Sequence, residues 1–369
     1  MEKRRLASAS NWPGLPEDLL DSIIPRLVYI SDYIRFSAVC KSWNSVALKH
    51  KQKRERLTNH QYPLLLLISS RIEGCTSVSP YVFNFMTKSG IQDIQLHRFF
   101  WYGRCRGCLI YIRQACYEFF DVRIMPKHID DFGTPIDLPR LCCFRPGHTR
   151  PDKVKSVVLS RDPCFGSFDV LITSYSCYAA HMKFDSKNWT CSGLGRSDYF
   201  ASLVFYKDHI LGASNRGGVL SLDVNIDHSL VPKGEKILPD LEHVRDSSGC
   251  FLVEATNGDL LMVLWYHDFD IHERYKLYKL LYSNGQHERI PIANLSGDSI
   301  FWGINHPVSV LASDYPGLCR PNSIYLICQR QPSDYICEEF NFEDRSMRED
   351  EIDEPYLTSA SWIVPPIKL

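Results

Sequence analysis

Residues 250–266 read CFLVEATNGDLLMVLWY, and this stretch decides the fold class. Two apolar runs of strand length flank the dipeptide Asn257-Gly258. Both residue types tolerate the positive φ angles of a tight turn, so an Asn-Gly pair between apolar runs is a strong signal for a β-hairpin. Asn284-Gly285 repeats the signal further along the chain. The stretch therefore predicts short antiparallel strands.

The same pattern continues from residue 64 towards the C-terminus. Short apolar or alternating runs are separated by Gly, Asn, Asp, Ser and Pro, as in residues 154–160, 168–173 and 322–328. Many short strands at nearly regular spacing are typical of sandwiches, barrels and propellers. The region is too long for one ordinary sandwich, whereas blades of about 40–45 residues would give a ring of six or seven. We therefore expect a six- or seven-bladed β-propeller over residues 60–345.

The residues before this region differ, because their apolar side chains recur at helical spacing. Within LPEDLLDSIIPRL, residues 15–27, one broad face carries Leu19, Leu20, Ile23, Ile24 and Leu27. This spacing predicts an amphipathic helix. Pro25 should end or kink that helix near Ile24, because proline lacks a backbone N–H and clashes with the preceding turn. Residues 31–56 predict further short helices, so we expect a mainly β protein with a small all-α domain over residues 11–52.

The composition is that of a soluble globular protein. The chain has 369 residues, 44% hydrophobic side chains and a formal net charge of −1. No stretch approaches the roughly 18 apolar residues of a membrane helix, and residues 1–14 lack the apolar segment of a secretory signal. Fourteen cysteines without such a signal argue against a disulfide framework. We therefore expect a protein of the nucleus, the cytoplasm or both, with no membrane partner.

The helical domain carries more apolar surface than so small a unit can bury. A bundle of about 40 residues usually needs a staple or a partner to be stable. Each buried Leu or Ile would contribute about 1.5–3 kcal/mol, and tryptophan, here Trp43, is often an anchor at interfaces. The alternative is that the apolar row is only the core of the domain. We prefer the interpretation that another polypeptide covers part of it.

LPEDLLDSIIPRL followed by SAVCKSWNSV, residues 37–46, resembles the F-box. In that family a Leu-Pro pair, a Leu-rich helix and a Val-Cys-Lys-x-Trp motif contact a Skp-type adaptor, which binds a cullin and, through it, a RING subunit. The resemblance implies an adaptor-binding set that comprises Trp12, Leu15, Pro16, Leu19, Leu20, Ile23, Leu27, Val39 and Trp43. Pro25 and Ser31-Asp32 depart from the family's pattern.

The C-terminal region resembles the KIB-type β-propeller of a large plant F-box family. The similarity lies in residues 250–266, in YKLYKL at residues 275–280 and in SGDSIFWGINHPVSVLASDYPGLCRPNSIYLI at residues 296–327. It implies the substrate-recognition subunit of an SCF-type E3 ubiquitin ligase, whose propeller binds an unknown protein target. Such a subunit is a non-catalytic adaptor with no cofactor and no metal. We expect residues 346–369 to form an acidic connection and then a strand, near residues 356–363, that closes the ring.

Cysteines and histidines between residues 105 and 148 could form a zinc site or stay unliganded. Cys105-Arg-Gly-Cys108 has the spacing of half a zinc site, and further candidate ligands follow at Cys116, His128, Cys142, Cys143 and His148. A structural zinc needs four ligands in a defined geometry, yet no second CxxC or paired-histidine motif is present. We therefore interpret these residues as cysteines and histidines of strands and loops.

Three other motifs have less specific interpretations. Residues 267–273, HDFDIHE, could hold a metal or act in acid–base catalysis, but their position between two strands favours a solvated hairpin loop. Gly193-Leu-Gly195 lacks the third glycine of a dinucleotide loop. The basic run Lys49–Arg56 could contact nucleic acid, but it has no interleaved aromatic residues, so a solvated helix end is preferred and no nucleic acid partner is expected.

Two alternative functions stay open from the sequence. The chain could be an F-box scaffold that binds its partner without ubiquitylation. It could also be a propeller that binds or processes a small molecule or a carbohydrate, which would be indicated by a polar pocket with converging carboxylates at the central channel.

Overall fold

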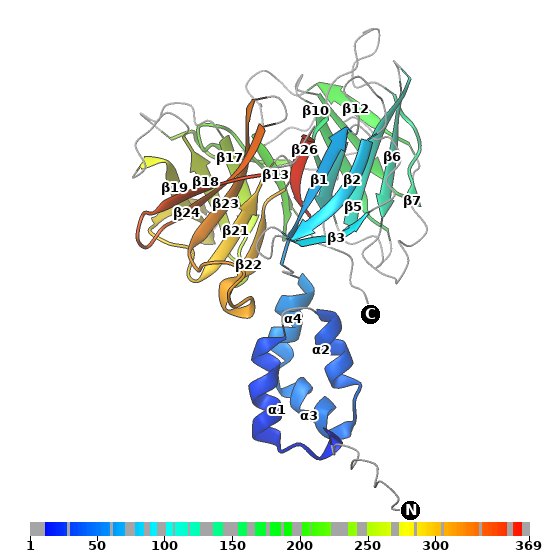
Figure 1. The fold of residues 1–369 in the computed structure, drawn as a ribbon. Helices are drawn as coiled ribbons and strands as arrows, with labels where there is room; N and C mark the ends of the chain where they lie inside the picture. The colour runs from blue at the N-terminus through cyan, green and yellow to red at the C-terminus, as the bar shows by residue number, and fades with distance from the viewer. Residues whose placement is uncertain are drawn as a thin grey trace, which may run out of the picture.

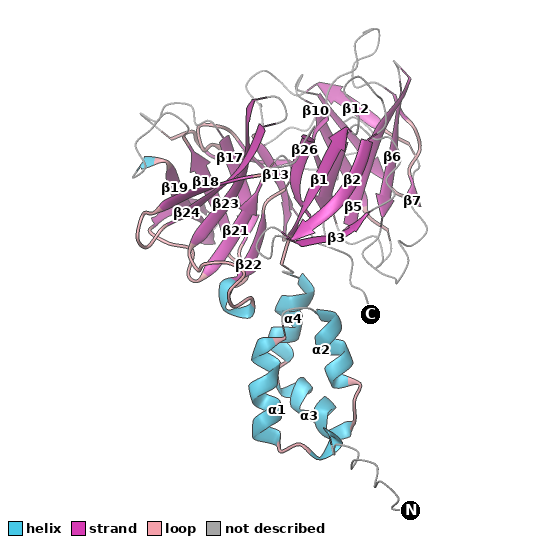
Figure 2. Cartoon of the chain, in the orientation of Figure 1, coloured by secondary structure: helices cyan, strands magenta, loops and turns pink. Residues whose placement is uncertain are grey.

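The structure, a computed structural model, is mainly β, with a small helical region at the N-terminus (Figures 1 and 2). None of the helices that it describes is long and apolar enough to cross a membrane. The described residues are 12–27, 30–59, 62–70, 78–84, 89–93, 101–105, 108–116, 119–125, 136–142, 154–160, 167–174, 178–185, 188–193, 201–207, 209–222, 235–241, 249–266, 273–283, 286–303, 306–331, 334–352 and 357–363.

The helical domain consists of short helices and two 3-10 turns: η1 (Trp12–Gly14), α1 (Glu17–Ile23), η2 (Ile24–Arg26), α2 (Ile30–Ser37), α3 (Lys41–Lys49) and α4 (Lys51–Asn59). The prediction for Pro25 is confirmed, because α1 ends at Ile23 and the chain continues as the 3-10 turn that contains Pro25. Leu20 and Ile24 are fully buried in a core that includes Tyr33 of α2 and Trp43 of α3.

The described strands form six sheets, four with four strands and two with five. The first sheet contains β1 (Leu64–Ser70), β2 (Val78–Asn84), β3 (Ser89–Asp93) and β26 (Leu357–Ile363). The second contains β4 (Trp101–Cys105), β5 (Cys108–Cys116), β6 (Phe119–Met125), β7 (Ile136–Asp137) and β8 (Leu141–Cys142). The third contains β9 (Val154–Leu159), β10 (Asp169–Ser174), β11 (Tyr178–Lys183) and β12 (Thr190–Gly193).

The remaining sheets follow in chain order. The fourth contains β13 (Ser202–Tyr206), β14 (His209–Ala213), β15 (Val219–Leu222) and β16 (Glu235–Leu238). The fifth contains β17 (Gly249–Glu254), β18 (Leu260–Trp265), β19 (Tyr275–Ser283) and β20 (Gln286–Ile292). The sixth contains β21 (Asp298–Trp302), β22 (Val308–Leu311), β23 (Ser323–Gln331), β24 (Asp334–Asn341) and β25 (Met347–Glu351). Pairing is antiparallel except between β21 and β23, which run parallel.

The first sheet joins the two ends of the β domain. β26 pairs antiparallel with β1, so that Leu64 lies opposite Ile363 and Leu67 lies opposite Ala360. Figure 1 shows β26, in red, beside β1, in blue. The side of β1 that faces away from β2 is therefore paired rather than left as an open edge.

The hairpin predicted from residues 250–266 is present as β17 and β18. Glu254 lies opposite Leu260, and the intervening turn has Gly258 at φ +84°. The Gly258 N–H donates to the carbonyl oxygen of Ala255 (2.9 Å). This positive φ is the reason that the turn uses an Asn-Gly pair. Asn284-Gly285 lies outside the described residues.

The acidic stretch near the C-terminus was predicted to be a connection, and this is wrong for residues 347–351. They form β25, which pairs with β24 at the outer edge of the sixth sheet. Four of its five side chains, Arg348 to Glu351, are exposed, because an edge strand has a neighbour on one side only. Charges at an exposed edge also oppose pairing with other chains. Residues 353–356 lie outside the described part of the chain.

A histidine links two sheets that are not consecutive in the chain. His306, in the connection from β21 to β22, places its Nε2 atom 3.3 Å from Ser156 Oγ on β9 and bonds the carbonyl oxygen of Val157 (2.5 Å). β9 itself packs against β4 and β13, in the second and fourth sheets. The contact therefore fastens the sixth sheet directly to the third.

Candidate functional site

Four predicted adaptor-binding residues lie at the surface of the helical domain. The exposed fraction is 59% for Trp12, 47% for Leu19 and 46% for Val39. Pro16, next to the start of α1, is also exposed. Apolar side chains that stay this accessible in the folded chain are available to contact a partner.

The other five predicted residues are less accessible. Leu15, Ile23 and Leu27 are partly buried and pack against the helical core. Leu20 is fully buried and Trp43 is only 8% exposed, so in the free chain both side chains belong to the helical core, and their contact with an adaptor stays a prediction. Trp43 packs on Phe36 with the ring centroids 4.6 Å apart, because both project from neighbouring helices into the same core.

One exposed apolar residue was missed by the sequence analysis. Leu48, on α3, has an exposed fraction of 61%. Trp43, Val46 and Ala47 form the buried face of this helix, and the 100° step between successive residues turns Leu48 away from it. A helical-wheel plot of α3 would have identified Leu48. In the part of the chain that the structure describes, four of the five exposed large hydrophobic side chains belong to the helical domain.

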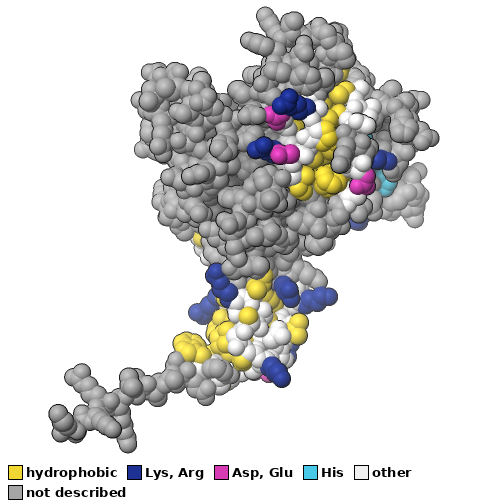
Figure 3. Space-filling view, turned by 90° about the vertical axis from the view of Figure 1, so that its right-hand side faces the viewer, with side chains coloured by type: hydrophobic (Ala, Val, Ile, Leu, Met, Phe, Trp, Pro, Cys, Tyr) yellow, Lys and Arg dark blue, Asp and Glu magenta, His cyan; other side chains and the backbone are white. Residues whose placement is uncertain are grey.

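Polar contacts join the C-terminal end of α3 to α1 at the surface of the domain. His50 Nε2 lies 3.0 Å from Asp21 Oδ1, and Lys49 bonds Glu17. The hydrogen bond and negative charge of Glu17 raise the pKa of Lys49. Figure 3 shows hydrophobic side chains on this domain with Lys and Arg side chains around them. Exposed hydrophobic side chains and charged side chains therefore occur together on this domain, as at many protein interfaces.

The basic run Lys49–Arg56 is not uniformly solvated, in contrast to the preferred interpretation. Lys53, on α4, is only 7% exposed, whereas Lys51 and Arg54 are exposed. The Lys53 ammonium donates to the carbonyl oxygen of Pro25 (2.9 Å) and lies 3.5 Å from Asp314 Oδ1. Lys53 therefore faces inward, towards the β domain.

No metal site comes together among the described residues: no group of three His, Cys, Asp or Glu side chains could hold an ion. Cys105 and Cys108 lie opposite each other where β4 meets β5, and Cys116 and Cys142 end β5 and β8. His128, Cys143, His148 and residues 267–272 lie outside the described part, as does Gly195, whereas Gly193 ends β12 and Glu273 is exposed.

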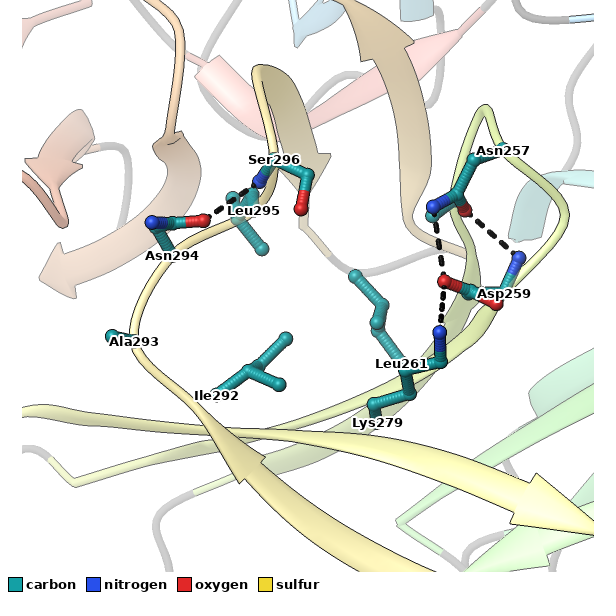
Figure 4. A pocket seen from close by; sticks show the side chains of 10 residues that line it. Asn257, Asp259, Leu261, Lys279, Ile292, Ala293, Asn294, Leu295 and Ser296 are labelled. Carbon is teal, nitrogen blue, oxygen red and sulfur yellow. Dashed lines mark hydrogen bonds and ion pairs between the residues drawn. The ribbon is translucent and has the colours of Figure 1, made fainter.

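A pocket of about 300 Å³ lies in the fifth sheet, between the β17–β18 turn and the segment that joins β20 to β21 (Figure 4). Its apolar lining includes Leu261, Ile292 and Leu295. Its polar side chains bond one another. Asp259 Oδ2 accepts from Lys279 Nζ (2.6 Å) and from Asn257 Nδ2 (2.9 Å). Asp259 is the only carboxylate among the lining residues, so the pocket itself does not supply the paired carboxylates of a glycosidase site.

The pocket lies beside a hydrogen-bonded junction between the fifth and sixth sheets. Asp298, at the start of β21, is 3% exposed, and its carboxylate accepts from the Thr256 N–H (2.7 Å) and from Ser309 Oγ (2.8 Å). Thr256 belongs to the same turn as Asn257. Each oxygen of this buried carboxylate has a donor, as a stable interior requires.

Comparison with known families decides what these two parts are. A model of the F-box domain matches residues 12–55, and a model described as the KIB1-4 β-propeller matches residues 94–352, well over half of the chain. The chain belongs to the KIB1-4 β-propeller family. This KIB1-4 propeller protein thus carries an F-box at its N-terminus, as the sequence predicted.

Solved structures resemble the KIB1-4 protein only distantly. TolB from Acinetobacter baumannii has 8% sequence identity and a TM-score of 0.45, with 87% of this chain and 70% of TolB covered. A putative 6-phosphogluconolactonase from Bacteroides uniformis has 14% identity and a TM-score of 0.40, with 78% and 82% covered. These similarities are too low to carry an argument. No curated protein matches the chain.

Proposed function

We propose that this protein is the substrate-recognition subunit of an SCF-type E3 ubiquitin ligase. Its F-box binds a Skp-type adaptor and, through it, a cullin and a RING subunit. Its β domain, whose six sheets we take as six blades of one propeller, binds a target protein. The protein then acts by proximity, because tethering a target beside a conjugating enzyme raises its effective concentration.

The exposed apolar side chains of the F-box carry this proposal. Trp12, Leu19 and Val39 are exposed in the free chain. The resemblance to the F-box places the same three residues among the positions that contact the adaptor. Burying one Leu or Val side chain at an interface is worth about 1.5–3 kcal/mol. We add Leu48 to this set because it has the largest exposed fraction of the four. Leu20 and Trp43 act from beneath, by holding the helices that display the exposed residues.

Target binding is assigned to loops of the propeller. Loop side chains are free of the packing demands that fix the residues of the sheets, so loops supply most binding residues in such folds. A role of this kind needs no catalytic residue in the chain. The compartment that we propose is the nucleus, the cytoplasm or both, where a ligase of this type meets its targets.

Adaptor binding is the first test. The full chain and its Trp12→Ala/Leu19→Ala variant are titrated with a purified Skp-type adaptor, and Ile290→Ala is the control because Ile290 is an exposed apolar residue, 40% accessible, on β20 of the propeller. Loss of two anchors should cost at least about 2 kcal/mol, a drop in affinity of roughly thirtyfold. Equal affinity of all three folded proteins would exclude the ligase assignment.

Further observations distinguish the ligase subunit from the two alternatives, a scaffold without ubiquitylation and a propeller that processes a carbohydrate. A scaffold without ubiquitylation would leave the half-life of a captured target unchanged when the F-box is deleted, whereas a ligase subunit would shorten it only when the F-box is present. A propeller that processes a carbohydrate needs an acid and a base, and the pocket near Lys279 offers one carboxylate, already in an ion pair. We therefore favour protein recognition over carbohydrate chemistry.

A further inference from the structure

The F-box and the propeller share a buried charged contact. Lys53, on α4, and Asp314, in the 3-10 turn η5 (Ala312–Asp314) after β22, lie 3.5 Å apart between Nζ and Oδ1. Their side chains are 8% and 6% exposed. The Lys53 ammonium also donates to the carbonyl oxygen of Pro25 at 2.9 Å. One lysine thus contacts the 3-10 turn at the end of α1, in the F-box, and a turn of the sixth sheet.

An aromatic residue completes the junction. Tyr62 follows α4 and precedes β1, and it is 2% exposed. Its ring lies edge-on to Phe301, with centroids 5.3 Å apart, and 5.4 Å from Tyr315. Its hydroxyl donates to the carbonyl oxygen of Leu318 (3.0 Å). The apolar core of the helices is therefore continuous with that of the sixth sheet, in one cluster that includes Leu57 and Tyr62.

These contacts define one orientation of the two domains. Separating them would expose the Tyr62 cluster to water, which is unfavourable in proportion to the apolar area uncovered. Sliding one domain over the other would separate the Lys53 ammonium from the Asp314 carboxylate, and breaking a buried ion pair is strongly destabilising. A buried ion pair of this kind suits a role in fixing register, because it penalises every arrangement except the matched one.

We propose that Lys53, Asp314 and Tyr62 are positioning residues, which fix the propeller relative to the F-box and so determine which lysines of a bound protein reach the ubiquitin-loaded enzyme. This inference rests on the proposed function. In a ligase that works by proximity, the direction in which the target is held decides which amino groups come within reach. The junction would then control the choice of lysine rather than the strength of adaptor or target binding.

The orientation can be measured without a known target. Fluorophores are attached through unnatural amino acids at Ser45, on α3, and at Asn257, in the β17–β18 turn, which are both exposed. Single-molecule energy transfer then reports the distance between the domains of the full chain. We expect one narrow distribution for the native protein. Lys53→Met and Asp314→Ala should both broaden it, since each removes one side of the same pair.

The matched control is Lys49→Met, which removes a neighbouring lysine whose side chain is 56% exposed and whose partner, Glu17, lies within the F-box. It should leave the distribution unchanged. Lys53→Met/Asp314→Leu removes both charges and keeps apolar volume at the site, so it should restore the narrow distribution. If a single-charge variant does not fold, Tyr62→Leu tests the junction from its aromatic side and should also broaden the distribution.

The functional arm uses the propeller's own lysines as acceptors. The chain is assembled with a Skp-type adaptor, a cullin and a RING subunit, and ubiquitin attached to exposed Lys183, Lys207 and Lys236 is mapped by mass spectrometry. Lys53→Met and Asp314→Ala should shift ubiquitin among these sites in the same way, while adaptor affinity stays at the native value. The paired apolar variant should return the native pattern.

The two proposals fail differently. If the native chain does not bind the adaptor, the ligase function is excluded, but the energy-transfer measurement still tests the junction. If the adaptor binds and folded Lys53→Met and Asp314→Ala variants keep both the narrow distribution and the native ubiquitin pattern, the junction has no positioning role. Altered orientation with an unchanged ubiquitin pattern would overturn the proposed control of lysine choice.

Discussion

Trp43 donates a hydrogen bond from its indole Nε1 to the backbone carbonyl oxygen of Trp12, at 3.2 Å. The two tryptophans have opposite environments, because Trp43 is 8% exposed and Trp12 is 59% exposed. The buried ring therefore holds the backbone that displays the exposed one. Trp43 thus supports the fold, and Trp12 is available to contact a partner. The F-box motif alone does not distinguish these two roles.

Replacing each tryptophan should affect different properties. Trp43→Phe keeps an aromatic ring against Phe36 but loses the hydrogen bond to Trp12, which is worth about 1 kcal/mol of unfolding free energy. Trp12→Ala should leave stability nearly unchanged and weaken adaptor binding. Urea unfolding and adaptor titration of the same preparations measure both effects. A larger loss of stability in Trp12→Ala than in Trp43→Phe would contradict the assignment of roles.

Leu20 and Leu48 offer a second comparison within the F-box. Leu20 is fully buried and Leu48 is 61% exposed. Leu20→Ala should lower the unfolding free energy by about 2–5 kcal/mol, as large-to-small changes in a core do. Leu48→Ala should change stability by less than about 0.5 kcal/mol but reduce adaptor affinity. Unaltered adaptor affinity in Leu48→Ala would remove Leu48 from the binding surface.

A buried ion pair joins the fifth and sixth sheets. Glu338, on β24, is fully buried and accepts from Arg274 Nε (3.2 Å) and from the Tyr275 hydroxyl (2.6 Å). Burial, together with the charge of Glu338, raises the pKa of Tyr275, so this hydroxyl keeps its proton and stays a donor. Arg274→Met should lower the unfolding free energy by about 3–5 kcal/mol, because it leaves the carboxylate without its counter-charge.

The control for this prediction is Arg330→Met. Arg330 pairs with Glu349 on β25, and their side chains are 44% and 35% exposed. Exposed pairs contribute at most about 1 kcal/mol. Urea unfolding monitored by tryptophan fluorescence should therefore show a large change for Arg274→Met and a small one for Arg330→Met. Equal changes would mean that the buried network adds nothing beyond a surface pair.

His181 makes the stability of the propeller depend on pH. It lies on β11, is 6% exposed, and burial lowers its pKa below the ordinary 6.5; the nearby Asp169 and Lys183 act in opposite directions. At pH values between the lowered folded pKa and 6.5, His181 is therefore mostly protonated in the unfolded chain and mostly neutral in the folded chain. The stability associated with neutral His181 is present above pH 6.5 and is lost as the pH falls from there towards the lowered folded pKa.

The expected signature is a difference between variants at two pH values. Between pH 7.5 and 5.5 the native protein should lose more unfolding free energy than His181→Leu does. His209→Leu, which changes an exposed histidine on β14, should behave like the native protein. Identical losses in the native protein and His181→Leu would show that another group is responsible.

Patterns between near neighbours in the chain predicted much of this structure. The helix that ends near Pro25 and the hairpin around Gly258 depend on residues a few positions apart, and both are present. The fold class followed from the same local periodicity. Residues 348–351 were predicted to be a connection but belong to the edge strand β25. This edge strand exposes nearly all its side chains, so its sequence resembles that of a loop.

Contacts between distant segments could not be read in this way. Leu19 and Leu20 are adjacent and both apolar, yet only Leu20 enters the core, because the packing of α1 against α3 decides which of them is covered. The sequence around Lys53 predicted a solvated basic run. It could not show that Lys53 is buried, because the partner Asp314 lies about 260 positions further along the chain, in the turn after β22. The bond between His306 and Val157 of β9 likewise joins residues 149 positions apart in the chain.

The pairing of β26 with β1 sets the order in which a newly synthesised chain can mature. Because Leu64–Ser70 are synthesised before the other five sheets and Leu357–Ile363 after them, the edge of β1 stays uncovered until those sheets have been made. Until then β1 presents unpaired backbone groups to other nascent chains and to chaperones. Under the proposed function, a premature stop between Ile292 and Leu357 would release the F-box attached to a β domain in which β1 lacks this partner strand, a product that would occupy adaptors without delivering a target.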